Sequence, residues 1–285
     1  MSSSAPAIQP DAQLYDEALG RLRPSSGRLA GRRILVVGAG QRDIDDPQPP
    51  VGNGRAISQL FAHEGATLTC VDINPAALAQ TCALVREAGG TAHEEVADVA
   101  DAQAIPGVVE RAAARMQGLD GLVMVVGVAS GLALDAQSAE AWDAEHAVNV
   151  RACMLFGQQA LRHMAPGGSI ILLSSIAALR NSSSNPAYET TKAAQVSLAR
   201  SIAMAGQAKG VRCNSLLPGL MDTPIGRAAT RRRTDRLAMP LPFGRQGTGW
   251  EVAHAALFLM SHESSYVNAH ALVVDGGLIG GISRK

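Results

Sequence analysis

The sequence predicts one doubly wound α/β domain, in which helices cover both faces of a parallel sheet. Short apolar segments alternate with longer amphipathic ones from residue 33 to residue 277, and this alternation is typical of such folds. Aromatic residues make up only 3% of the chain and hydrophobic residues 47%, so aliphatic side chains must build the core. The 285 residues would allow one or two domains, but no linker or internal repeat divides them.

About seven segments are predicted as strands, because each is a short apolar run of strand length. They are residues 33–38, 66–72, 92–99, 119–127, 168–175, 211–219 and 270–277. The segments between them have helical periodicity; in the first, Ala56, Ile57, Leu60 and Phe61 share one face. The second has Pro75 near its start, a position that favours proline. The predicted helices are residues 54–65, 74–90, 101–116, 139–164, 185–210 and 250–261.

The N-terminal residues 1–30 are polar and rich in Ser, Pro and Ala. They indicate a loose extension, with a short helix within residues 14–22, ahead of a single domain over residues 31–285. The start of the chain lacks the basic and apolar regions of a secretory signal. The apolar runs are far shorter than a membrane span. A formal net charge of zero gives no global attraction to nucleic acid or to an acidic membrane.

The four cysteines have no metal-like spacing. They are Cys70, Cys82, Cys153 and Cys213. Most fall in apolar runs, where a free thiol behaves as a small buried hydrophobic group. We therefore expect reduced thiols, no metal site and a cytoplasmic protein.

Glycines gather where the first strand meets the next helix. Gly38 ends the strand, and Gly52 and Gly54 open the helix, whose free N–H groups favour an anion. Thirteen residues separate Gly38 from Gly52, where a usual nucleotide-binding turn has about three. The pattern allows two interpretations, a dinucleotide-binding turn with about ten extra residues or a plain strand–loop–helix connection.

Two aspartates at strand ends favour the nucleotide. Asp72 ends the second strand 20 residues beyond Gly52, where an acid would accept hydrogen bonds from an adenosine ribose. Asp98 ends the third strand and suits a place beside the adenine. Either aspartate could instead be only a helix cap.

A proton-transfer site is indicated by Tyr188 and Lys192, which lie four residues apart and so project from one helix face. An ammonium near a phenol lowers the tyrosine pKa from its usual value of about 10. The tyrosine can then donate and accept a proton near neutral pH. Ser175 ends the fifth strand and Asn149 lies in the preceding helix. The plain alternative is a surface pair.

On these motifs, residues 29–278 resemble the short-chain dehydrogenase/reductase family. The resemblance implies a Rossmann fold and hydride transfer between a nicotinamide and a carbon bearing oxygen. Asn149, Ser175, Tyr188 and Lys192 match the family's catalytic tetrad. Tyr188 would pass the proton, Ser175 would bind the substrate oxygen, and Lys192 would bind the ribose. Asn149 would hold a water that links Lys192 to solvent.

Further segments match the family. Pro218 and Gly219 follow the sixth strand, with Thr223 placed to meet the nicotinamide carboxamide, and residues 266–277 resemble the C-terminal strand. The resemblance also implies a homotetramer or dimer and a small alcohol or ketone substrate. The implied cofactor-binding residues are Gly38, Arg42, Gly52, Asn53, Gly54, Asp72, Asp98, Val99, Gly127, Tyr188, Lys192, Pro218, Gly219 and Thr223.

We expect NAD(H) rather than NADP(H), because Asp72 would repel a 2′-phosphate. Ile73 and Asn74 bring no positive charge to offset it, although Arg55 is close in sequence and weakens the argument. The family's Asn-Asn-Ala-Gly after the fourth strand is here Met124 to Gly127, so side-chain hydrogen bonds that would tie this strand end are absent.

Residues 41–51, which we call the Asp/Pro segment, would be an addition to the turn. Its three prolines predict an ordered, extended conformation. The segment would fold over the cofactor with Arg42 near a phosphate, or it would be a tolerated surface insertion. We expect its acidic side chains to point to solvent or to a partner subunit. They are Asp43, Asp45 and Asp46.

Two further questions stay open. A dinucleotide-binding sensor or scaffold without turnover is the alternative to an enzyme. Several arginines after the sixth strand would either meet a carboxylate or phosphate on the substrate or form a solvated helix face. They are Arg227, Arg231, Arg232, Arg233, Arg236 and Arg245. The physiological substrate, stereochemistry and preferred direction are not predicted.

Overall fold

The computed structural model describes residues 14–181, 184–232 and 241–281. Its centre is a seven-stranded sheet in which every described pair of neighbours is parallel, with the order β3-β2-β1-β4-β5-β6-β9. The strands are β1 (Arg33–Val37), β2 (Thr67–Asp72), β3 (Thr91–Val96), β4 (Leu119–Met124), β5 (Met164–Leu173), β6 (Arg212–Pro218) and β9 (Ala271–Val274). The predicted doubly wound fold is confirmed. The strand order reverses between β1 and β4, where such folds bind ligands.

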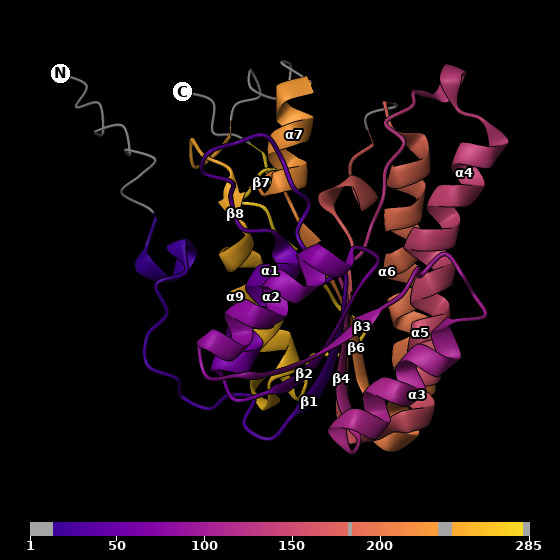
Figure 1. Cartoon of the computed structure of the whole chain (residues 1–285). Coiled ribbons are helices and arrows are strands. Elements are labelled where there is room, and N and C mark those ends of the chain that lie inside the picture. Colours follow the sequence, from indigo (N-terminus) through magenta and orange to yellow (C-terminus); the bar gives the residue numbers. More distant parts are fainter. Residues whose placement is uncertain (1–13, 182–183, 233–240, 282–285) are drawn as a thin grey trace.

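Helices cover both faces of this sheet (Figure 1). One face carries α1 (Asn53–His63), α2 (Pro75–Glu87) and α9 (Gly249–Met260). The other carries α3 (Ile105–Met116), α4 (Ala139–His146), α5 (Ala152–His163) and α6 (Pro186–Gly206). Each face has its own core of Val, Leu, Ile and Ala side chains, with Phe61 buried in one and Phe156 in the other. Burial of aliphatic surface on both faces is what holds a parallel sheet together.

A smaller layer lies beyond the carboxyl ends of the strands (Figure 1). It consists of helix α7 (Pro224–Arg232) and a two-stranded sheet of β7 (Met221–Asp222) and β8 (Gly247–Thr248). The Asp/Pro segment lies beside α7 in the same region, and it contains no helix or strand. The short 3₁₀ helices are η2 (Asp16–Leu19), η3 (Leu134–Ala136), η5 (Ile176–Ala178), η6 (Gln207–Lys209) and η7 (His262–Ser264).

The predicted helix over residues 139–164 is confirmed in its extent, since α5 ends at His163. A π-helical turn, Ala147–Arg151, lies between α4 and α5, and such single turns often occur at functional sites. The predicted start of the next strand is wrong, because β5 begins at Met164 rather than at residue 168.

The segment ahead of the domain is not loose from residue 14 onward. Thr248 Oγ1 donates a hydrogen bond of 2.8 Å to the carbonyl oxygen of Ala18 in η2, which packs on α9. Leu29 is fully buried, and Arg28 pairs with Glu263. Burial of Ala18 and Leu29 stabilises an ordered conformation of this segment. The domain boundary at residue 30 stays a prediction. Among the described helices, none has the length and apolar character needed to cross a membrane.

Candidate active site

The π-helical turn places Asn149 at the centre of the site, fully buried. Its side-chain amide pairs with the backbone of Val128, accepting from the nitrogen at 2.9 Å and donating to the oxygen at 2.8 Å. It also donates to Thr191 Oγ1 at 3.0 Å. The chain after β4 is therefore tied by Asn149, although Met124, Val125 and Val126 offer no polar side chains.

Helix α6 carries both Tyr188 and Lys192 beside the end of β5. The Lys192 ammonium lies 5.5 Å from the centre of the Tyr188 ring. Its Nζ donates 2.8 Å to the carbonyl oxygen of Leu173, the last residue of β5. Ser175 follows two residues later and accepts from the Ala177 nitrogen at 3.2 Å, which starts η5 against α6. The tetrad predicted from the sequence is thus gathered at one edge of the sheet.

Lys192 is almost fully buried, with 3% of its surface exposed. Burial lowers the pKa of its ammonium from 10.5 to about 8, because a low-polarity interior disfavours the charged form. A glycine at position 127 leaves room here: a Cβ at that position would lie 3.2 Å from Lys192 Nζ and 3.6 Å from Asn149 Oδ1.

The glycine turn has the close contacts that a nucleotide-binding turn needs. Gly38 has a φ of +88°, and a Cβ there would lie 2.6 Å from the Val126 nitrogen. A Cβ at Gly54 would lie 1.9 Å from the Gly38 oxygen. Gly52 caps α1, and the first N–H groups of a helix have no partners within it. Asn53, the first helical residue, has a buried Oδ1 with no hydrogen-bond partner in the described part of the chain. The turn can therefore receive an anion and a hydroxyl donor.

Asp72 lies at the end of β2 and holds the turn. Its carboxylate accepts from the Gly40 nitrogen at 2.8 Å and from the Asn74 nitrogen at 3.0 Å. With Gly38, Asp98 and Val99 it lines a small cavity of about 110 Å³ at the ends of β1, β2 and β3. Asp98 also accepts from the Ala100 nitrogen at 2.8 Å. Neither aspartate caps a helix, because Asn74 caps α2 and α3 begins after Ala104. Both aspartates line the same cavity.

Arg55 does not point toward Asp72. It is buried, and its guanidinium donates to Thr81 Oγ1 at 3.0 Å and to Gln80 Oε1 at 2.7 Å on α2. Burial lowers the pKa of its guanidinium below the usual value. Arg55 therefore contacts α2 and does not offset the charge of Asp72.

The Asp/Pro segment is attached to the site at two points. At its root, Gln41 Oε1 accepts from the Gly52 nitrogen at 2.8 Å. Further along, the Asp46 carboxylate accepts from Arg227 at 2.8 Å and from Arg231 at 2.7 Å, both on α7. The side chain of Asp46 is only 8% exposed. The expectation that Asp46 points to solvent or to a partner subunit is therefore wrong, because two guanidinium groups stabilise the carboxylate within the chain.

These ion pairs form a chain of charges. Arg227 also forms a bidentate pair with Asp222, at 2.9 and 2.5 Å. The hydrogen bond to Arg227 is the largest effect that lowers the pKa of Asp46. The hydrogen bonds that Arg227 donates, first to Asp222 and then to Asp46, raise the pKa of Arg227. We call the contacts of Asp46 and Asp222 with Arg227 and Arg231 the α7 clasp.

Arg227, Arg231 and Arg245 each pair with a carboxylate of the chain itself. Arg231 is exposed on α7, as the solvated-face interpretation expects. Arg245 pairs with Glu251 at 2.6 Å and supports the capping box that starts α9. Arg233 and Arg236 lie outside the described residues, as does the side chain of Arg232.

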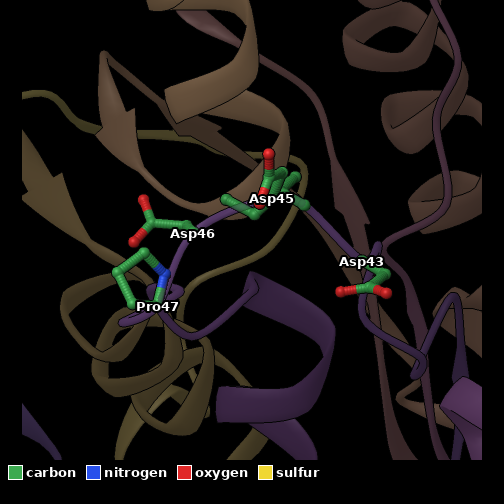
Figure 2. A pocket seen from close by; sticks show the side chains of 5 residues that line it. Asp43, Asp45, Asp46 and Pro47 are labelled. Carbon is green, nitrogen blue, oxygen red and sulfur yellow. The ribbon is translucent and has the colours of Figure 1, made fainter.

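The three acidic side chains of the Asp/Pro segment do not point toward a common centre. Figure 2 shows Asp43, Asp45 and Asp46 pointing apart around an open hollow of about 560 Å³, which Ile44 and Pro47 also line. Arg42 is exposed. Across the ranges that the structure describes, no three His, Cys, Asp or Glu side chains are grouped to hold a metal ion. All four cysteines are free and buried, as expected.

The segment after β6 adds the last predicted residues. Pro218 ends β6, and the Gly219 nitrogen donates to the Val274 oxygen at 2.8 Å. A Cβ at Gly219 would lie 2.6 Å from Asp275 Cβ, so the close approach requires glycine. Thr223 Oγ1 accepts from the Gly226 nitrogen at 3.2 Å at the start of α7. These residues lie at the same edge of the sheet as the tetrad.

Sequence reasoning missed two polar residues of the site. Gln195, fully buried, accepts from Lys192 Nζ at 3.1 Å and donates to the Asn149 oxygen at 2.7 Å. Thr191 accepts from Asn149 and donates to the backbone carbonyl oxygen of Tyr188 at 2.8 Å. Both residues lie within one helical turn of Lys192, and Ala193 and Ala194 stand between Lys192 and Gln195. Polar side chains so close to a predicted catalytic lysine are the signal that could have identified them.

Comparison with known proteins points to one family. A family model described as enoyl-(acyl carrier protein) reductase matches residues 51–279. The chain is 31% identical over 257 residues to 3-oxoacyl-[acyl-carrier-protein] reductase of Thermotoga maritima, covering 88% of this chain and 99% of that protein. It is 36% identical over 231 residues to cis-4-hydroxycyclohexanecarboxylate dehydrogenase of Sinomonas cyclohexanicum, covering 79% and 92%.

Solved structures agree. A crystal structure described as a short-chain dehydrogenase/reductase from Burkholderia xenovorans superimposes with a TM-score of 0.82 at 34% identity, covering 90% of this chain and all of the other. A double mutant of a Serratia marcescens short-chain dehydrogenase/reductase gives 0.81 at 29% identity, covering 88% and 99%.

Proposed function

The chain belongs to the short-chain dehydrogenase/reductase family, and from this premise we propose how its residues divide the reaction. It is an oxidoreductase that uses a nicotinamide cofactor and acts on CH–OH or C=O groups. The observation that carries the assignment of roles is the Lys192 ammonium 5.5 Å from the Tyr188 ring, on the helix that packs against η5 after Ser175.

Tyr188 is the general acid and base. Its phenol gives a proton to the substrate oxygen during reduction and takes it back during oxidation. Lys192 stabilises the phenolate form, because a nearby ammonium lowers a phenol pKa. Ser175 donates a hydrogen bond to the same substrate oxygen and stabilises its developing charge. Asn149 keeps the chain after β4 in place through its paired hydrogen bonds to Val128.

The glycine turn fits a dinucleotide. Gly38, Gly52 and Gly54 leave the backbone open to a diphosphate, and Asn53 offers an unpartnered acceptor. Asp72, Asp98 and Val99 line the cavity for the adenosine. When bound, the nicotinamide supplies or accepts the hydride. Arg42, Gly127, Pro218, Gly219 and Thr223 complete the proposed contacts, with Lys192 and Tyr188 toward the nicotinamide ribose.

We propose NAD(H) over NADP(H). The Asp72 carboxylate faces the cavity where a 2′-phosphate would lie, and Arg55 is held on α2. Four reduced cysteines suit a cytoplasmic setting, and the family resemblance favours a homotetramer or dimer. The single-domain assignment for residues 31–285 belongs to the same proposal.

The substrate is proposed to be a secondary alcohol or the matching ketone. The similar proteins bear the names of a 3-oxoacyl reductase, a hydroxycyclohexanecarboxylate dehydrogenase and, in dog, a (3R)-3-hydroxyacyl-CoA dehydrogenase. Each of these names refers to a substrate with a hydroxyl group or a ketone. These three substrates differ in size and charge, so they define the reacting group and leave the remainder open.

The experiment combines a substrate panel with one variant. Purified protein is given NAD(H) or NADP(H) and a series of secondary alcohols and ketones, and absorbance of the reduced nicotinamide is followed. Tyr188→Phe keeps the ring but lacks the exchangeable proton, so kcat should fall by at least about a hundredfold while the cofactor Kd stays nearly unchanged. More than about a tenth of the wild-type kcat in this variant would exclude Tyr188 as the acid and base. Cofactor binding without turnover of any substrate would favour the silent sensor.

A further inference from the structure

The Lys192 ammonium is held by two neutral oxygens. It donates 2.8 Å to the Leu173 carbonyl and 3.1 Å to Gln195 Oε1. An ammonium has three N–H donors, so these two contacts leave one direction for a ligand. The titratable side chains that face it in the described structure are Tyr188, from its own helix, and Cys153, from α5. Burial raises the pKa of Cys153 to about 11, so this thiol is neutral near pH 7.

The Gln195 amide can have only one orientation. Its Nε2 donates to the Asn149 backbone oxygen at 2.7 Å and approaches Cys153 Sγ at 3.4 Å. A flipped amide would turn its NH₂ toward the ammonium and its oxygen toward the Asn149 carbonyl, which are two repulsive contacts. The arrangement of neighbours therefore aims Oε1 at Lys192.

One protein side chain joins the ammonium to the Asn149 backbone oxygen, because Gln195 accepts from Lys192 Nζ and donates to that oxygen. An amide does not pass on a proton without rearranging its own bonds, so Gln195 holds the ammonium and is not a carrier of its proton.

We propose that Gln195 is the positioning residue of Lys192, and that its amide oxygen stabilises the charged ammonium. The proposal rests on the proposed function only for its effect on catalysis. The contact itself is a property of the protein without cofactor. Gln195 touches neither substrate nor cofactor in this account and acts through Lys192.

The test follows the Lys192 ammonium directly. The chain has only three lysines, Lys192, Lys209 and Lys285, so protein labelled with ¹³C at lysine Cε gives few signals, and Lys192→Arg identifies the one from Lys192. In the wild type this signal should titrate near pH 8. Gln195→Leu removes a hydrogen-bond acceptor from the charged form of Lys192. The pKa of Lys192 should therefore fall by about one unit, which is a tenfold change in its protonation equilibrium. Gln195→Glu places a carboxylate beside the ammonium, so the pKa should rise.

Opposite shifts are the signature that a merely structural role would not produce. The matched control is Gln159→Leu, the same change at a buried glutamine of α5 that accepts from Arg162 and not from Lys192; the Lys192 titration of this variant should match the wild type. In ketone reduction, loss of activity with rising pH should begin at lower pH in Gln195→Leu and at higher pH in Gln195→Glu. Identical Lys192 titrations in the wild type and both Gln195 variants would overturn the proposal. A wild type inactive on every substrate would count against the proposed function alone, because the titration needs no turnover.

Discussion

The roles of two glycines in the turn can be separated by one methyl group each. A Cβ at Gly54 would lie 1.9 Å from the Gly38 oxygen and 3.0 Å from the Gly38 carbon. Both atoms belong to the backbone that leaves β1, so neither can rotate away. Real Cβ contacts do not fall below 3.0 Å, and Gly54→Ala must therefore move α1 from β1 by 3.0 − 1.9 = 1.1 Å.

The matched change is Gly52→Ala. The nearest atom to a Cβ there is Gln41 Oε1 at 3.6 Å, which is an ordinary contact. The φ of Gly52 is −75°, which alanine adopts without strain. A methyl group at this position would instead occupy space where we propose the diphosphate approaches the backbone.

Gly54→Ala should lower the stability of the fold, whereas Gly52→Ala should weaken cofactor binding. Overpacking costs about 1–3 kcal/mol, and we expect the upper part of that range for Gly54→Ala because backbone has to move. A loss of about 2–3 kcal/mol lowers Tm by roughly 4–12 °C in a protein of this size. Gly52→Ala should change Tm by less than about 2 °C, while the cofactor Kd should rise about tenfold, equivalent to about 1.4 kcal/mol.

Thermal unfolding by circular dichroism without cofactor measures the first effect. Titration with NADH, followed by fluorescence of Trp142 and Trp250, measures the second. A Tm for Gly54→Ala within about 2 °C of the wild type would refute the packing argument. A Kd for Gly52→Ala equal to that of the wild type would refute the placement of the diphosphate.

Three other expected outcomes follow from the site. Asp72→Asn removes the charge that faces a 2′-phosphate, so the NAD-to-NADP ratio of kcat/KM should fall at least about tenfold; an unchanged ratio contradicts the assignment. Replacing residues 41–50 by a short link should raise the cofactor Kd and off-rate, whereas a folded variant with both unchanged would show that the Asp/Pro segment is dispensable. Lys192 has a folded pKa of about 8, below its unfolded 10.5, so the unfolded state binds more protons between these values and stability rises with pH there. Urea unfolding of Lys192→Met should lack this rise, and equal slopes in both proteins would contradict the depressed pKa.

The fold and the tetrad could be predicted because their signals are local. Buried parallel strands are continuous apolar runs, and Tyr188 and Lys192 need only a four-residue spacing on one helix. The helix break at Ala147–Arg151 was missed, since a π-turn changes hydrogen bonding without changing the apolar pattern.

Long-range pairings between charged side chains had no such signal. Asp46 and Arg227 are 181 residues apart, and nothing in their spacing relates them. The Asp/Pro segment contains three aspartates. Repulsion by a cofactor phosphate was the only electrostatic effect considered for them, and it predicted that all three point to solvent or to a partner subunit. For Asp46, two guanidinium groups from α7 outweigh that repulsion.

The α7 clasp gives the Asp/Pro segment a place in the site that an addition to a loop need not have. One end of the segment is fixed to the glycine turn, through Gln41 and the Gly52 nitrogen. Its middle is fixed to α7, through Asp46 and Arg227, and Arg227 is fixed in turn to Asp222 beside Thr223. The segment thus connects the turn proposed to bind the diphosphate with α7, which begins directly after Thr223, the residue proposed to meet the nicotinamide carboxamide. The diphosphate and the nicotinamide of one cofactor would share this support, in which the Asp46 carboxylate and the carbonyl oxygens of Asp45 and Gln48 all accept from Arg227 or Arg231.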